Sequence, residues 1–127
     1  MREPGVRPVV LIVNQDLGFV CWLSEVLAQA GYYPMPALNS REAVRIVGDL
    51  NLPIDVAIVD PGLPGVGEAM RTVTNQYPAL RTIAVRDTAG AIEPKTIPAR
   101  HSCSAGTSQQ DWIKSVGRVL KISRTAA

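Results

Sequence analysis

The chain of 127 residues has little of several features that would mark a specialised protein class. Its two cysteines, Cys21 and Cys103, lie far apart and match no metal-ligand spacing, so we expect free thiols. Thirteen basic and eleven acidic residues give a net charge of only +2, which is too small to indicate nucleic-acid binding. No apolar run is long enough to cross a bilayer, and no signal peptide is evident. These absences predict a cytoplasmic protein that binds neither nucleic acid nor membrane.

What is present is the composition of an ordinary globular domain, with 46% hydrophobic and 19% charged residues. This length predicts a single domain over residues 1–127, which can bury about two-thirds of its unfolded surface. The one histidine, His101, has no serine in a nucleophile-elbow setting to act with, so we expect no enzyme.

Strand-like and helix-like segments alternate along the chain. Continuous apolar runs predict buried parallel strands, and a proline-interrupted run predicts an edge strand. The predicted strands are Val9–Val13, Tyr32–Ala37, Val56–Val59 and Leu80–Val85. Apolar residues at helical spacing predict helices. The first two are Leu17–Ala30 and a helix from an N-cap at Ser40 to about Leu50, which packs through Ala43, Val44 and Val47. The third runs over Val66 to Tyr77. The last lies around Trp112 to Leu120 and is capped by Ser108 with Asp111 or by Thr107 with Gln110.

The stretch from Arg86 to Gly106 gives a weaker signal. Pro94 and Pro98 leave room for only a short or irregular helix, and Arg100–Ser104 is a poor fifth strand. Whether this region is ordered without a partner is left open. Five alternating units still predict an α/β fold, in which helices cover both faces of a parallel sheet.

The third predicted strand ends on a carboxylate, Asp60, and is followed by the loop Pro61–Gly65. In open α/β sheets the functional crevice lies outside the carboxyl ends of the strands. An acid at this position is therefore placed for chemistry or for binding.

Three features together resemble the receiver domain of two-component response regulators. They are the polar cluster Asn14-Gln15-Asp16 after the first strand, Asp60 at the end of the third strand, and Leu63-Pro64-Gly65 just after it. The resemblance covers Val9 to about Val85 well and the rest in outline. It implies a flavodoxin-like (CheY-like) sandwich with strand order 2-1-3-4-5, and a phosphoacceptor aspartate at the position of Asp60.

The chemistry that this resemblance implies is Mg²⁺-dependent transfer of a phosphoryl group from a phosphohistidine to Asp60. The family holds the metal with two consecutive acids after the first strand, and here those positions are Asn14 and Gln15. Neutral amides lack the negative charge that a divalent cation prefers. We therefore expect no cofactor, and at most a weakly bound Mg²⁺ held by Asp60 and Asp16.

Two further family positions also differ. The Ser or Thr expected at the end of the fourth strand corresponds to Arg86, with Thr88 two residues later, and the Lys expected after the fifth strand is missing. Arg86 is either solvated or pairs with Asp60 in place of the metal and the lysine. This pattern is typical of a degenerate receiver, or pseudo-receiver.

Several roles remain open at this stage. Asn14 and Gln15 either hydrogen-bond Asp60 or are ordinary loop residues, and Asp16 either caps the first helix or enters the pocket. Trp22 falls at the edge of an apolar helical arc, where it either anchors a partner or is half-buried. A basic stripe on the last helix is weak evidence for an anionic partner. It consists of Lys114, Arg118 and Lys121.

The leading hypothesis is a stand-alone, atypical response-regulator receiver in phosphorelay signal transduction. It acts by protein–protein contact with a sensor histidine kinase or another signalling protein, and a homodimer is left open. One alternative is a working receiver that a histidine kinase phosphorylates at Asp60, with Asp16 as a metal ligand. A second alternative is a small nucleotide-binding Rossmann-like protein, which the lack of a Gly-rich fingerprint argues against.

Overall fold

The computed structural model describes residues 7–49, 53–86 and 101–125. In this part of the chain, five parallel strands form one sheet in the order β2-β1-β3-β4-β5. The elements are β1 (Val9–Val13), α1 (Leu17–Gln29), β2 (Tyr33–Ala37), α2 (Ser40–Asp49), β3 (Val56–Val59), α3 (Val66–Gln76), β4 (Arg81–Arg86), β5 (His101–Ser104) and α4 (Gln109–Thr125). This sheet confirms the predicted fold class and strand order.

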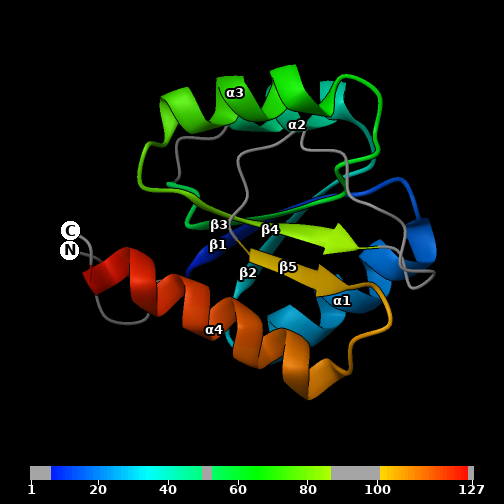
Figure 1. Ribbon diagram of the computed structural model, residues 1–127, viewed down its shortest axis with the longest axis vertical. Coiled ribbons are helices and arrows are strands. Elements are labelled where there is room, and N and C mark those ends of the chain that lie inside the picture. Colours follow the sequence, from blue (N-terminus) through cyan, green and yellow to red (C-terminus); the bar gives the residue numbers. More distant parts are fainter. Residues whose placement is uncertain (1–6, 50–52, 87–100, 126–127) are drawn as a thin grey trace.

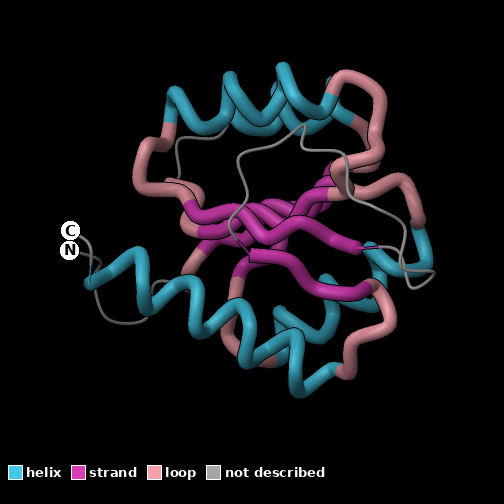
Figure 2. The backbone as a smooth tube through the Cα atoms, viewed as in Figure 1, coloured by secondary structure: helices cyan, strands magenta, loops and turns pink. Residues whose placement is uncertain are grey.

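The sheet lies between two layers of helices, with α2 and α3 on one face and α1 and α4 on the other (Figure 1). The tube view in Figure 2 shows the same three layers. Because helices cover both faces, β1 and β3 are buried along their whole length. This burial explains why both strands are continuous apolar runs rather than alternating ones.

Each face of the sheet has its own apolar core. Successive strand residues point to opposite faces, so Leu11 packs beneath α2 and α3 whereas Ile12 packs beneath α1 and α4. Trp112 of α4 is fully buried in the second core, where its ring lies 5.9 Å from that of Phe19. The ring centroid of Trp22 lies 6.3 Å from that of Phe19, and 39% of the surface of Trp22 is exposed.

The edge strand β2 carries two prolines at alternate positions. Tyr33 N donates to Pro8 O at 2.8 Å, and Asn14 N donates to Ala37 O at 3.1 Å. The backbone N–H and C=O groups of the odd-numbered residues of β2 therefore point toward β1. Pro34 and Pro36 therefore stand at positions whose N–H would point to the open edge. The predicted assignment of this segment to a sheet edge is confirmed.

At the start of α2 the prediction was wrong in one detail. Asn39, not Ser40, caps the helix: Asn39 Oδ1 accepts from Glu42 N at 2.8 Å, and Asn39 Nδ2 donates to Glu42 Oε2 at 3.4 Å. The Ser40 hydroxyl instead donates to Pro64 O at 2.7 Å, in the loop between β3 and α3. Val44, predicted to pack inward, is exposed because it lies on the outer flank of the helix.

Of the two predicted caps for α4, the structure has the one at Ser108. Ser108 Oγ accepts from Asp111 N at 3.2 Å, so Ser108 is the cap. His101–Ser104 confirms the predicted fifth strand. The predicted short helix near Pro94 and Pro98 lies outside the described residues.

Candidate functional site

The carboxyl ends of β1 and β3 bring Asn14 and Asp60 to the same edge of the sheet. Val13 pairs with Val59 in the parallel register, and Asp60 N donates to Val13 O at 2.9 Å. The loops that follow the two strands therefore start side by side, at the end of the sheet where sequence analysis expected a site.

Asp60 is half-buried, and its carboxylate turns toward its own loop. Asp60 Oδ1 accepts from Gly62 N at 2.9 Å, which makes an Asx turn. A Cβ at Gly62 would lie 3.4 Å from Asp60 Oδ1, so the glycine lets the loop approach the carboxylate closely. Within the described residues, Oδ2 accepts no hydrogen bond, so this oxygen remains available to solvent or to a ligand.

Asn14 is a buried polar residue with 6% of its surface exposed. Its Oδ1 accepts from Asp16 N at 2.9 Å, so the amide oxygen is already used to shape the loop after β1. Asp16 Oδ1 in turn accepts from Phe19 N at 3.2 Å and caps α1. The N-cap alternative for Asp16 is thus confirmed.

The structure does not link these residues to Asp60 in the way that the sequence suggested. Across the described part of the chain, no hydrogen bond joins Asn14 or Gln15 to the Asp60 carboxylate. Gln15 is exposed. Asn14, Asp16 and Asp60 each accept instead from a backbone N–H two or three residues later, and Gln15 faces solvent.

Arg86 ends β4 and is exposed. Its backbone O accepts from Ala105 N at 3.0 Å, and no ion pair with Asp60 occurs among residues 7–49, 53–86 and 101–125. The register places Ser104 beside Arg86, and Ser104 Oγ accepts from Gly106 N at 3.2 Å. Sequence reasoning missed this hydroxyl because the weak signal of β5 did not fix its register. Thr88 lies outside the described residues.

A Mg²⁺ ion, which the receiver resemblance implies, does not fit the residues present. The described ranges contain no cluster of three or more His, Cys, Asp or Glu side chains that could hold a metal. At this edge Asn14 offers an amide oxygen that already accepts a hydrogen bond, and Asp16 is the cap of a helix. Asp60 alone supplies less negative charge than a divalent cation usually receives from protein carboxylates together with phosphate.

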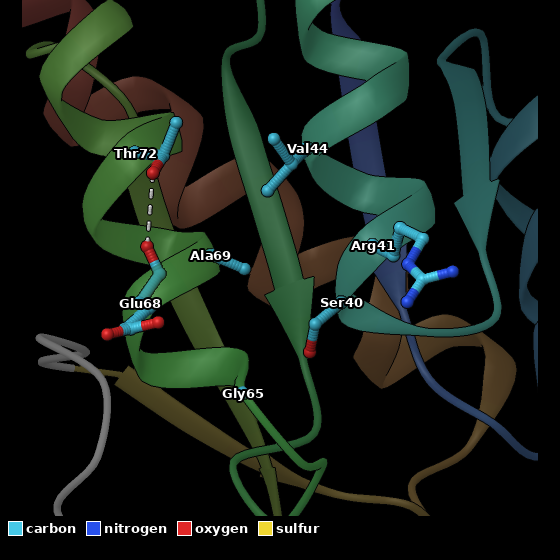
Figure 3. A pocket seen from close by; sticks show the side chains of 7 residues that line it. All are labelled: Ser40, Arg41, Val44, Gly65, Glu68, Ala69 and Thr72. Carbon is cyan, nitrogen blue, oxygen red and sulfur yellow. Dashed lines mark hydrogen bonds between the residues drawn. The ribbon is translucent and has the colours of Figure 1, made fainter.

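A shallow hollow of about 260 Å³ lies next to the Asp60 loop, between α2 and α3 (Figure 3). It is lined by Ser40, Arg41, Val44, Gly65, Glu68, Ala69 and Thr72. In Figure 3 the charged ends of Arg41 and Glu68 point away from each other, and Thr72 Oγ1 donates to Glu68 O at 3.2 Å. Ser40 of this lining also donates to Pro64 O, next to Gly65. The polar side chains that line this hollow do not point toward a common ligand position.

No protein-family model matches this sequence, and no curated protein matches it. Solved structures match in fold. A CheY-like response regulator receiver domain protein from Methanospirillum hungatei JF-1 has a TM-score of 0.81 at 17% identity, over 96% of this chain and 100% of that one. The chemotaxis response regulator CheY4 of Vibrio cholerae has a TM-score of 0.75 at 23% identity, over 90% of this chain and 99% of that one.

A putative response regulator from Chloroflexus aurantiacus J-10-fl gives a TM-score of 0.76 at 24% identity, over 91% of this chain and 99% of that one. At such identities these similarities concern the fold. The chain has the CheY-like receiver fold over nearly its whole length. No helix in the described ranges has the length and hydropathy needed to cross a membrane.

Proposed function

We propose that this chain is an atypical receiver domain of two-component signalling, which acts by protein–protein contact with weak or no Mg²⁺-dependent phosphorylation at Asp60. The receiver fold supports the signalling role. The observation that carries the atypical character is Asn14, a buried neutral amide beside the phosphoacceptor position, whose oxygen accepts from Asp16 N.

The physical argument concerns charge. A transferring phosphoryl group spreads negative charge over its oxygens, and enzymes neutralise that charge with metal ions and cationic side chains. Here two amides stand where acids would hold the metal, and the exposed Arg86 forms no described ion pair with Asp60. Without a cation between them, an incoming phosphate and the Asp60 carboxylate repel each other. Phosphoryl transfer to Asp60 is therefore expected to be slow.

The test is incubation with acetyl phosphate and Mg²⁺, followed by intact-mass spectrometry. We expect no gain of about 80 Da, the mass of one added HPO₃ group, in the natural sequence. The double variant Asn14→Asp, Gln15→Asp restores two acids and should gain this mass. An aspartate at position 14 can still accept from Asp16 N, so the loop should keep its shape.

The matched control adds Asp60→Asn to the double variant and should lose the gain. Prompt phosphorylation of the natural chain at Asp60 would contradict the proposal and favour the working-receiver alternative. Fluorescence titration with Mg²⁺ alone gives a second readout, since only the double variant should bind the ion at millimolar concentrations.

The proposed partner is a sensor histidine kinase or another signalling protein in the cytoplasm. The loops after β1 and β3 are held by local hydrogen bonds, and they would present a fixed surface to such a partner. The nucleotide-binding alternative gains no support from the residues at this edge. A thermal-shift screen with nucleotides checks it directly.

A further inference from the structure

A recess of about 240 Å³ lies between the edge strand β5 and α4, on the face of the sheet opposite α2 and α3. The proposed function makes no use of it. Its lining comes from β4, β5 and α4, and consists of Ile83, His101, Ser102, Ser115, Arg118 and Val119. Figure 1 shows α4 running alongside β5 at this corner of the molecule.

Three of the lining side chains are hydrogen-bond donors. His101 has a ring N–H in either protonation state, the Arg118 guanidinium carries five N–H groups, and Ser115 has a hydroxyl, which also lies 3.9 Å from Cys103 Sγ. Ser102 follows His101 on the strand, so its side chain points to the other face of the sheet. No acidic residue is among the described lining residues. Donors from two different elements face one recess without a negative partner, which is the arrangement that an anion requires.

The charge of α4 favours the same kind of ligand. The described side chains of this helix include one acid, Asp111, and three basic residues, which are Lys114, Arg118 and Lys121. Asp111 lies seven residues before Arg118, or about 10 Å along the helix axis, and does not line the recess. The described part of α4 therefore carries a net positive charge.

Ile83 and Val119 close the inner side of the recess. With 1% and 2% of their surfaces exposed, they offer a ligand almost no apolar area, and the accessible lining is mainly polar. The volume equals roughly eight times the ~30 Å³ that a water molecule occupies in the liquid, which exceeds what one phosphate ion needs. A ligand with an anionic head and a short organic part would fill this volume.

We propose that this recess binds a small organic anion. Its phosphate or carboxylate head accepts hydrogen bonds from His101 and Arg118, with Ser115 beside them, and its short organic part fills the remaining volume of the recess. The site is separate from Asp60, so its ligand would act alongside the signalling contacts of the carboxyl edge. This inference does not depend on whether Asp60 is phosphorylated.

The test is NMR titration of the full chain with n-propyl phosphate and with butyrate, in which the backbone amides of Ser102 and Ser115 are followed. We expect saturable shifts of these amides with at least one of the two anions. Inorganic phosphate should bind more weakly because it leaves part of the recess unfilled and makes fewer contacts. Propanol, which lacks the charge, should produce no saturable shift.

Arg118→Gln should weaken binding roughly ten-fold or more, since it removes a charged donor from the ligand head. Lys114→Gln is the matched control: it makes the same charge change one helical turn away, outside the recess. This control should change affinity by less than about two-fold. Both residues are exposed, so both variants should fold, which the remaining amide signals check.

An equal loss in the two variants would show that the basic helix attracts anions without a defined site, and would overturn the proposal. The absence of saturable shifts in the natural chain, with both organic anions, would overturn it as well. Neither outcome bears on the phosphorylation test at Asp60, because these probes carry no activated phosphoryl group.

Discussion

Asn14, Asp16 and Asp60 at the carboxyl edge of the sheet each accept a hydrogen bond from a backbone N–H two or three residues later in the chain. A sequence can identify such residues by position, since each follows a strand or precedes a helix. It cannot decide between an Asx turn, a helix cap and a ligand contact, because the same side-chain oxygen serves all three. The cap of α2 shows this ambiguity: Asn39 and Ser40 are both good caps, and only the contact of Ser40 with Pro64, in the loop before α3, separates their roles.

Replacing either of two glycines by alanine should change the free energy of unfolding, in opposite directions. Gly65 has a φ of +73°, a left-handed conformation, so Gly65→Ala should lower the free energy of unfolding by about 1–2 kcal/mol, although a Cβ there meets nothing closer than 3.9 Å. Gly48 lies in α2 with ordinary φ and open space around it. Gly48→Ala should raise stability by about 0.5–1 kcal/mol. Urea unfolding measures both, and equal effects would contradict the backbone explanation.

Asp16→Ala removes the cap of α1 and should lower the free energy of unfolding by about 1 kcal/mol. Gln15→Ala, at the exposed neighbouring position, should change it by less than about 0.5 kcal/mol. The two are compared by urea unfolding followed by circular dichroism. An unchanged stability for Asp16→Ala would show that another acceptor serves the first turn.

At the scale of elements, the strands were the most predictable feature. β1 and β3 are apolar at every position because both faces are covered, and no loop or surface helix gives such a pattern. The bounds of α1 were predicted to within one residue. The position of β5 was harder to predict, because Cys103 is its one buried residue, so this edge strand needs little apolar sequence. Its register, and with it the place of Ser104, follows only from pairing with β4.

The prolines of β2 should protect the open edge of the sheet from pairing with another chain. The double variant Pro34→Val, Pro36→Val restores two N–H donors at this edge and should aggregate at lower temperature than the natural chain. Light scattering during heating measures this difference. Pro78→Val, at an exposed turn outside the sheet, is the control and should leave the onset temperature unchanged. Equal onset for all three proteins would contradict a protective role.

For the molecule as a whole, stability rests on two cores that share one sheet. Trp112 is the largest fully buried side chain, and it joins α4 to the sheet and to Phe19 of α1. The pattern of apolar residues predicted which residues enter these cores, because strand alternation and helical spacing leave few choices. The same pattern could not place His101 and Arg118 at one recess, since they belong to different elements and no local spacing joins them.

Trp112→Ala should lower the free energy of unfolding by about 3–5 kcal/mol. This is a large share of the roughly 5–15 kcal/mol that stabilises a typical domain, so the variant should be marginally folded. Trp22→Ala, which changes a side chain with 39% of its surface exposed, should cost much less. Urea denaturation compares the two variants, and equal losses would show that α4 does not depend on its tryptophan for packing.

The two tryptophans also give the protein an intrinsic pair of optical reporters. Light emitted by the indole of Trp112 comes from a dry interior, whereas that of Trp22 comes from a ring which dissolved iodide can reach. Replacing either ring with phenylalanine would isolate the colour and quenching of the other. Fluorescence of the remaining tryptophan would then distinguish binding at the outer side of α1 from loosening of the interior, without any attached dye.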